Sequence, residues 1–237
     1  METKQSNRIQ TSILNAAEKK ALVYLAGKQP KWVTSDTLTF IGFIGALLIG
    51  AGFVLSSLDY AFLWLANFGL LVNWYGDSLD GTLARVRKQQ RKIYGFYIDH
   101  TVDCVNELIM FSCAGLSAMC HNFVLPMFCL IFYLLLSNNV NINAHLKGEF
   151  KLTYAKLGPT EFRIIIFIAN IVFMYVSPIR DFLATWTICG HDFTIGPLDV
   201  VAIGVVLILA MIYFVTIIQD AKYYAKIDPR PEAPKED

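Results

Sequence analysis

The chain has 237 residues, of which 55% are hydrophobic and only 16% charged, and its mean hydropathy is +0.48. Soluble globular domains carry roughly a quarter of charged residues, so this composition excludes an ordinary soluble domain and indicates a polytopic membrane protein. The net charge of +1 is small, but lysine and arginine are distributed unevenly along the chain.

The first element in chain order is an amphipathic segment at residues 9–27. Its apolar residues are predicted to share one helical face, and they are Ile13, Leu14, Ala17, Ala21, Leu22 and Leu25. Lys19 and Lys20 would suit anionic headgroups, which favours a helix lying on the membrane surface. Packing of the same face against the rest of the protein is the alternative interpretation.

Six later stretches are long and apolar enough to cross a membrane, which takes about 20 residues each. They are residues 37–57, 60–85, 95–118, 122–146, 160–179 and 198–219. We therefore expect an all-α fold with six transmembrane helices behind an interfacial helix. The expected division is an N-terminal segment at 1–36, a transmembrane domain at 37–220 and a disordered tail at 221–237.

Basic residues gather on one side of these expected spans. Of the 20 lysines and arginines, only Arg180 lies in a connection on the other side. The positive-inside rule then places the basic side, with both termini, in the cytoplasm. Lys147, Lys151, Lys156 and Arg163 form one basic patch, which suits either lipid phosphate or a plain determinant of topology.

Four carboxylates lie inside the expected membrane helices. Asp77 and Asp80 come near the end of the second span, and Asp99 and Asp103 near the start of the third. Spacings of three and four residues place each pair on one helical face. A carboxylate at membrane depth is costly unless it faces a cation, a cavity or a partner. A divalent metal bound to a phosphate ligand would compensate all four.

Small and basic residues accompany the carboxylates. Gly81 and Ala84 follow the first pair and would let a ligand approach the backbone, while Gly95 opens the third span. Arg85 is placed to hold a phosphate. Metal and arginine together suit the transfer of a phosphoryl group from a diphosphate, in which positioning and charge neutralisation provide most of the catalysis.

Two other functions compete with phosphoryl transfer. Intramembrane prenyltransferases also bind diphosphates through aspartates and Mg²⁺, but their two motifs usually lie on well-separated helices. Ion-coupled transporters also carry intramembrane acids, but these are spread through the membrane depth and accompany broken helices. Here the acids cluster at one side within a single helical hairpin.

The pattern D-x2-D-G-x2-A-R followed by G-x3-D-x3-D resembles the signature of the CDP-alcohol phosphotransferase (CDP-alcohol phosphatidyltransferase) family. Its eight fixed positions are Asp77, Asp80, Gly81, Ala84, Arg85, Gly95, Asp99 and Asp103. One departure is the gap between Arg85 and Gly95, which has nine residues where the common form has eight. The resemblance covers residues 9–220.

The resemblance implies a metal-dependent transferase of phospholipid biosynthesis. A substituted phosphate would pass from a CDP-alcohol to an acceptor alcohol, and CMP would leave. Asp77, Asp80 and Asp99 would hold Mg²⁺ or Mn²⁺, and Asp103 would be the general base and also touch a second metal. The CDP pocket would be lined by Gly81, Ala84, Arg85 and Gly95. The family also implies a homodimer.

A finer resemblance concerns Asp99-His100-x-x-Asp103 and Gly158-Pro159-Thr160-Glu161, which look like the choline/ethanolamine phosphotransferase branch. There a histidine and a glutamate assist deprotonation, so His100 and Glu161 become further catalytic candidates. Histidine is a suitable base near neutral pH, and a structural role is the alternative for His100. The branch favours a soluble CDP-alcohol donor and a diacylglycerol-type acceptor. The alternative is phosphatidyl transfer from CDP-diacylglycerol to a small polar alcohol.

Other polar residues lie near these motifs. Thr39 falls in a segment that takes the place of the family's P-N-x-x-T-x-x-G, and Asn73 shares a helical face with Asp77, so both are candidates for substrate binding. Asn138, Asn141 and His145 share a face of the fourth span. They suit either a vestibule for the acceptor or hydrogen bonds between helices.

Overall fold

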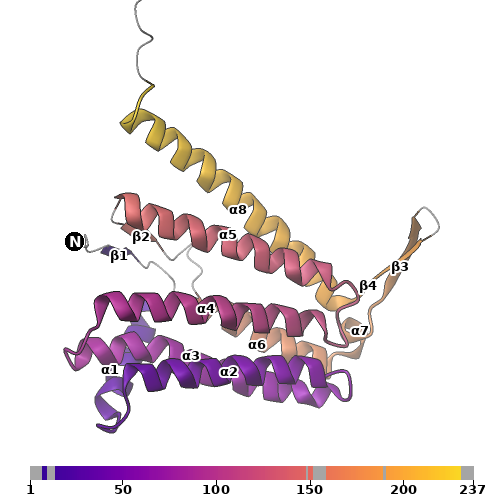
Figure 1. Ribbon diagram of the computed structural model, residues 1–237. Coiled ribbons are helices and arrows are strands. Elements are labelled where there is room, and N and C mark those ends of the chain that lie inside the picture. The colour runs from indigo at the N-terminus through magenta and orange to yellow at the C-terminus, as the bar shows by residue number, and fades with distance from the viewer. Residues whose placement is uncertain (1–6, 10–13, 148, 152–158, 189–190, 231–237) are drawn as a thin grey trace, which may run out of the picture.

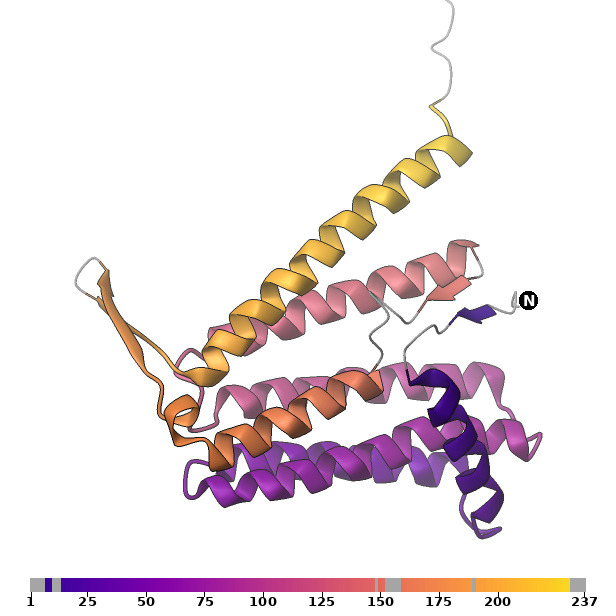
Figure 2. The same ribbon diagram turned by 180° about the vertical axis from the view of Figure 1, so that it is seen from behind.

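The computed structural model describes residues 7–9, 14–147, 149–151, 159–188 and 191–230. Six long helices run in roughly the same direction or its reverse (Figures 1 and 2). They are α2 (Ser35–Leu55), α3 (Leu63–Val86), α4 (Lys92–Gly115), α5 (Val124–Lys147), α6 (Pro159–Tyr175) and α8 (Pro197–Ile227). Helix α2 packs on both α3 and α4, whereas α8 packs mainly on α5 and diverges from the bundle.

Short elements complete the fold. They are β1 (Asn7–Ile9), α1 (Asn15–Lys28), the 3-10 turn η1 (Tyr60–Phe62), β2 (Glu149–Lys151), α7 (Ser177–Arg180), β3 (Ala184–Ile188) and β4 (His191–Ile195). Strand β1 pairs in parallel with β2, and β3 pairs antiparallel with β4. The expected helical fold is confirmed, with two small two-stranded sheets added to it.

Helices occupy all six predicted spans, and only α8 differs clearly because it continues to Ile227. Within the described residues, three of them are long and apolar enough to cross a membrane by themselves: α2, α5 and α8. Polar and acidic residues make α3 and α4 less apolar, and α6 has 17 residues. The apolar helices indicate a membrane protein, whereas six spans remain a prediction.

Glycine allows α2 and α3 to pack with their backbones in contact. A Cβ atom on Gly76 of α3 would collide with the backbone nitrogen of Gly42, and one on Gly45 of α2 would collide with that of Asn73. Asn73 also donates a hydrogen bond from Nδ2 to the carbonyl oxygen of Gly42, at 2.9 Å. The two helices therefore form a rigid pair, from which Asp77 and Asp80 project.

Substituting Gly76 by alanine should destabilise the protein. Because the new methyl group would meet backbone rather than a movable side chain, we expect a loss of about 1–3 kcal/mol, as for overpacked cores. Gly204→Ala in α8 is the matched control, since a Cβ there has no other atom within 4 Å. Thermal unfolding in detergent should show a lower midpoint for Gly76→Ala only. Equal midpoints would contradict the tight contact.

Helix α3 ends in a Schellman motif. The backbone N–H of Gln89 donates to the carbonyl of Ala84 at 2.9 Å, and that of Lys88 donates to Arg85 at 3.1 Å. Lys88 adopts a positive φ of 56°. The guanidinium of Arg87 donates to three carbonyl oxygens between α1 and α2, those of Gln29, Pro30 and Val33.

Helix α1 packs on α3, but it starts later than predicted and buries only part of the predicted face. Residue 9 belongs to β1, and the helix begins at Asn15. Of the expected apolar face, Leu22 is buried and Leu14 and Leu25 are half-buried, whereas Ala17 and Ala21 are exposed. The predicted Ile13 lies outside the described residues.

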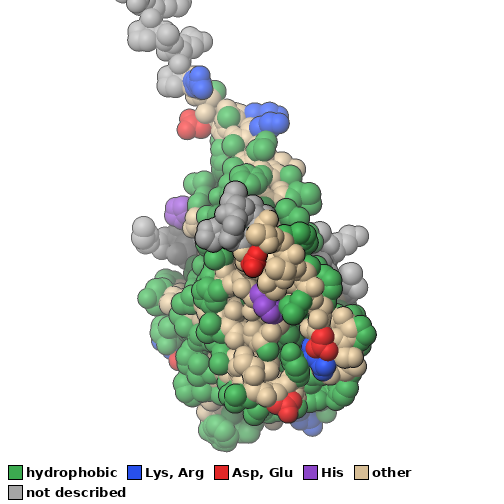
Figure 3. Space-filling view, turned by 90° about the vertical axis from the view of Figure 1, so that its right-hand side faces the viewer, with side chains coloured by type: hydrophobic (Ala, Val, Ile, Leu, Met, Phe, Trp, Pro, Cys, Tyr) green, Lys and Arg blue, Asp and Glu red, His purple; other side chains and the backbone are tan. Residues whose placement is uncertain are grey.

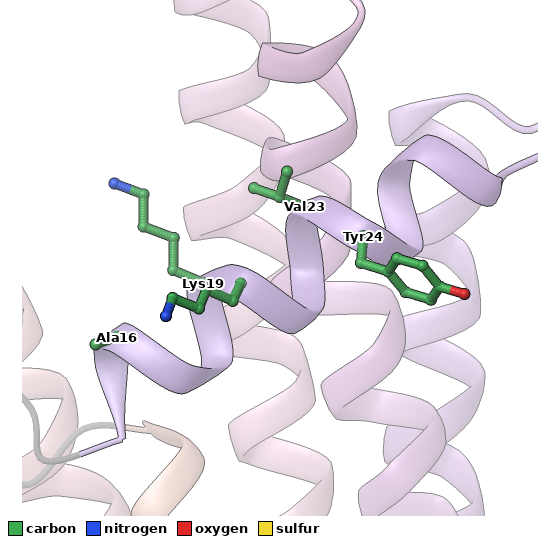
Figure 4. Close-up of a pocket in the computed structure, with 5 residues that line it drawn as sticks. Ala16, Lys19, Val23 and Tyr24 are labelled. Atoms are coloured by element: carbon green, nitrogen blue, oxygen red, sulfur yellow. The ribbon is translucent and has the colours of Figure 1, made fainter.

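A polar contact fixes the orientation of α1 on the protein. The carboxylate of Glu18 accepts hydrogen bonds from Trp74 Nε1 at 2.9 Å and from Thr160 Oγ1 at 2.5 Å. This turns Glu18 toward α3 and α6. The outer side of α1 carries the exposed Lys19 and Val23 among its side chains (Figure 4). Packing on the protein is thus observed, while contact with the membrane surface remains a prediction.

The predicted connection at 180–197 begins at the last residue of α7 and contains the β3–β4 hairpin, which projects from the bundle (Figure 1). Its base is held by Asp199, which is fully buried. The carboxylate accepts backbone hydrogen bonds from His121 and Gly196 at 2.8 Å and from Asn122 at 3.0 Å. Figure 3 shows this end of the molecule, where charged side chains are few.

Candidate active site

Three of the four predicted aspartates come together in the structure. Asp77 of α3 and Asp99 and Asp103 of α4 each offer a carboxylate oxygen, and these oxygens lie within 4.8 Å of one another. The arrangement arises because the short turn after α3 brings the start of α4 back beside its last turns, with both helices packed on α2. We call these three residues the carboxylate cluster.

Asp80 lies next to the cluster and is more deeply buried, with 8% of its surface exposed. Its Oδ2 accepts a hydrogen bond from the hydroxyl of Thr39 at 2.7 Å, and its other oxygen accepts one from the N–H of Gly81. Asp77 and Asp99 are close enough to repel it electrostatically. Thr39, predicted to bind substrate, therefore reaches the site through Asp80.

Arg163 of α6 is the cation that contacts the cluster. Its Nη2 lies 2.5 Å from Oδ2 of Asp77, and its Nε donates to Oδ1 of Asn73 at 3.0 Å. It also attracts the carboxylates of Asp103 and Glu107. Its third nitrogen, Nη1, is buried and has no hydrogen-bond partner within the described part of the chain.

The sequence interpretation missed this role, because it assigned Arg163 to a basic patch outside the site. A signal was present in the sequence: the arginine comes four residues after Pro159, where α6 begins. A charge just inside an apolar helix needs a partner. The identity of that partner was hidden, since Asp77 lies 86 residues earlier.

Asn73 contacts Arg163, which in turn contacts the carboxylate cluster. Asn73 is 1% exposed, and both ends of its amide are used, one by the carbonyl of Gly42 and the other by Arg163. The predicted substrate-binding residue therefore positions Arg163 in this structure. Glu107, one helical turn after Asp103, accepts a hydrogen bond from Tyr133 of α5 and extends the acidic region into the bundle.

The residues predicted to line a nucleotide pocket lie on the last turns of α3 and the first of α4. Arg85 is exposed, and its Nη2 donates to the hydroxyl of Thr82 at 2.8 Å. A Cβ on Gly81 would lie 3.4 Å from Nη1 of Arg85, and one on Gly95 would meet nothing within 4 Å. Ala84 is half-buried. Both glycines thus leave open space, and the space at Gly81 lies beside the arginine.

His100 and Glu161 have different surroundings. Nδ1 of His100 forms a 3.0 Å hydrogen bond with the carbonyl of Phe96 and lies 3.8 Å from the carboxylate of Asp99. Glu161 is 7% exposed, and its Oε1 accepts the backbone N–H of Leu14 at the start of α1. Gly158, which opens the Gly-Pro-Thr-Glu motif, lies outside the described residues.

Glu161→Gln should leave turnover within a few-fold of the unaltered protein. An amide oxygen can still accept the hydrogen bond from Leu14, so anchoring of α1 is retained, whereas Glu161→Ala should lose it and lower the unfolding midpoint. The measurement is turnover and thermal unfolding for both variants. Turnover abolished in a Glu161→Gln protein with an unchanged midpoint would instead assign Glu161 to proton transfer.

The remaining polar candidates lie on α5. Asn139 and Asn143 both donate to Oδ2 of Asp220 in α8, at 3.0 and 2.7 Å. Oδ1 of Asn141 is buried without a hydrogen-bond partner in the described structure, and His145 is exposed. Hydrogen bonding between α5 and α8 is therefore observed through Asn139 and Asn143, which the predicted set did not include.

The cluster has the composition of a divalent cation site. Mg²⁺ and Mn²⁺ prefer oxygen ligands, and three carboxylate oxygens converge here from two helices. A helical membrane protein that combines such a cluster with an arginine in direct contact has the make-up of an enzyme acting on phosphate groups.

Comparison with known protein families also indicates an enzyme that acts on phosphate groups. The family model described as CDP-alcohol phosphatidyltransferase matches residues 32–196, and the chain belongs to this family. The protein is accordingly a transferase of substituted phosphate groups that uses a CDP-alcohol, and members of the family generally depend on a divalent metal. No curated protein gave a match. The family predicted from the eight-residue pattern is confirmed, and the match does not distinguish its branches.

Proposed function

We propose that this protein transfers a substituted phosphate from a soluble CDP-alcohol to the hydroxyl of a diacylglycerol-type lipid, with release of CMP. The observation that supports the site is the convergence of Asp77, Asp99 and Asp103 within 4.8 Å, beside the guanidinium of Arg163. In the reaction, the acceptor oxygen forms a bond to the β-phosphorus while the bond from that phosphorus to CMP breaks.

The carboxylate cluster and Asp80 would hold Mg²⁺ or Mn²⁺. When bound, the metal supplies positive charge that stabilises the diphosphate oxygens in the transition state. Thr39 keeps Asp80 oriented through its 2.7 Å hydrogen bond, and Arg163 and Asn73 orient Asp77 in the same way. Arg85 would bind a phosphate of the CDP group, beside the open space at Gly81.

Asp103 is the proposed acceptor of the proton that the attacking hydroxyl loses. It is the member of the cluster furthest along α4, one helical turn beyond Asp99, and Glu107 follows it by a further turn. Asp99, Asp103 and Glu107 therefore share one face of α4. His100 and Glu161 are the alternatives that the branch resemblance implies; His100 contacts Phe96 and Asp99, and Glu161 contacts Leu14.

The choice of substrates rests on the resemblance of the Asp99-His100 and Thr160-Glu161 motifs to the choline/ethanolamine branch. The alternative is CDP-diacylglycerol as donor and a small polar alcohol as acceptor.

We further propose that all six long helices cross the membrane, that the site and both termini face the cytoplasm, and that residues 37–220 form the catalytic domain of a homodimer.

The experiment is a panel of donors and acceptors. Purified full-length protein in phosphatidylcholine vesicles with Mg²⁺ is given CDP-choline, CDP-ethanolamine or CDP-diacylglycerol, each with diacylglycerol or a set of small polar alcohols, and CMP is measured. We expect CMP only from a soluble donor combined with diacylglycerol. CMP only from CDP-diacylglycerol would select the alternative, and no CMP from any pair would refute the function.

A further inference from the structure

The β3–β4 hairpin has two chemically different faces. Side chains alternate between the faces of a strand, and the register pairs Trp186 directly with Phe193 and Ala184 with Ile195. Trp186 is 52% exposed and Phe193 47% exposed. The central pair of one face of the hairpin is therefore aromatic and open, with a tryptophan opposite a phenylalanine.

The opposite face is polar and pairs its own side chains. The hydroxyls of Thr185 and Thr194 lie 3.1 Å apart, and Thr187 donates to the carboxylate of Asp192 at 2.7 Å. A two-stranded hairpin is only marginally stable in water by itself. An open aromatic face on such an element indicates a surface that is covered in the working protein.

The position of the hairpin determines what can cover it. Pro197, the first residue of the membrane-crossing helix α8, comes two residues after the end of β4. The amide of Asn122 donates to the backbone carbonyl of Thr194 at 2.7 Å, so the base is fixed to the turn between α4 and α5. The hairpin thus begins where membrane helices end, at the level of the interface between lipid and water.

Two further observations favour lipid. Phe182 and Leu183, which lead into β3, are also exposed, at 45% and 58%, and charged side chains are sparse at this end of the molecule (Figure 3). Tryptophan is enriched at the membrane interface, where its ring meets both acyl chains and headgroups. This end is remote from the carboxylate cluster, because α4 continues roughly 18 Å beyond Asp103 before it ends.

We infer that the β3–β4 hairpin is a membrane-docking element, whose Trp186–Phe193 face inserts into the lipid leaflet on the side opposite the carboxylate cluster. Its polar face, with Thr185 and Asp192, stays in water. The hairpin would then fix the depth of the adjacent end of α8. This inference depends on the protein being embedded in a membrane and is independent of the substrates.

The test uses tryptophan emission of the full-length protein in phosphatidylcholine vesicles. The signal of Trp186 is the difference between the unaltered protein and Trp186→Phe, so that the other three tryptophans stay in place. The matched control adds Thr185→Trp to Trp186→Phe and is compared with Trp186→Phe alone. Helicity by circular dichroism checks folding, and Thr187→Trp replaces Thr185→Trp if that variant loses helicity.

We expect brominated phosphatidylcholine to quench most of the Trp186 signal, which should be shifted to the blue, while aqueous iodide leaves it unchanged. The tryptophan at position 185 should show the reverse. Quenching of Trp186 by iodide to the same extent as the control would overturn the inference, because the face would be in water. A Trp186 signal quenched by neither agent would also overturn it, since protein rather than lipid would cover the face.

Discussion

Asp103→Asn is expected to abolish CMP release while the protein stays folded. Asparagine keeps the size of the side chain but loses both the charge that would hold metal and the ability to accept a proton. General-base catalysis alone contributes about 10²–10⁴-fold, so turnover should fall by at least that factor. Rates measured with saturating Mg²⁺ and both substrates test this.

Asp103→Asn should lower turnover without lowering the stability of the folded protein. Asp77, Asp99 and Glu107 repel the carboxylate of Asp103, and Arg163 attracts it. Removing the charge without metal present should therefore leave the unfolding midpoint unchanged or raise it. Added Mg²⁺ should stabilise the unaltered protein, because it binds the folded state only, and should stabilise Asp103→Asn less.

His100→Ala is the companion variant for proton transfer. If Asp103 is the base, His100→Ala keeps measurable turnover, because the proton acceptor is still present in the carboxylate cluster. Full activity of Asp103→Asn would disprove the role given to Asp103. Loss of turnover in His100→Ala together with activity in Asp103→Asn would transfer that role to the histidine.

The second large effect is expected for Arg163→Ala. This substitution should lower the stability of the folded protein and make that stability depend more strongly on a divalent metal. The guanidinium contacts Asp77 and attracts Asp103 and Glu107, so its removal leaves several acids without their cation. Breaking a buried ion pair costs about 3–5 kcal/mol. Both side chains of the Arg163–Asp77 pair are still partly exposed, at 17% and 23%, so we expect a loss near the lower end.

Mg²⁺ separates this explanation from a general packing defect. A divalent cation would compensate the same carboxylates, so it should restore more stability to Arg163→Ala than it adds to the unaltered protein. Unfolding midpoints with EDTA and with Mg²⁺ measure this. The matched control is Arg180→Ala, which removes an exposed arginine paired with Asp181 at the other end. Equal effects of the two substitutions would exclude a special role for Arg163.

The positions of the long apolar stretches were sufficient to predict the helices. In a membrane such a stretch is helical, because only then are its backbone hydrogen bonds satisfied within the segment. The carboxylate cluster was also predictable, since residues three and four apart share a face and a short turn returns the chain beside itself. These are local relations. The sequence therefore predicted that Asp77 on α3 would face Asp99 and Asp103 on α4.

Contacts between distant segments were not predictable in this way. Neither the Arg163–Asp77 pair nor the turning of Glu18 toward Trp74 follows from spacing, because each joins residues more than 50 positions apart. The hairpin is a different case. The alternation of polar and apolar residues at 184–188 and 191–195 has the period of a strand, and the sequence interpretation overlooked it because it treated the segment only as a connection.

The Schellman motif after α3 explains how this chain can carry one more residue than the usual family pattern between Arg85 and Gly95. The last carbonyls of α3 are capped by Lys88 and Gln89, so the helix is completed by its own backbone before α4 begins. Residues beyond Gln89 therefore act as a spacer. One added residue in this spacer therefore leaves the position of Asp77 on α3 and of Asp99 and Asp103 on α4 unchanged, because each helix fixes its own residues.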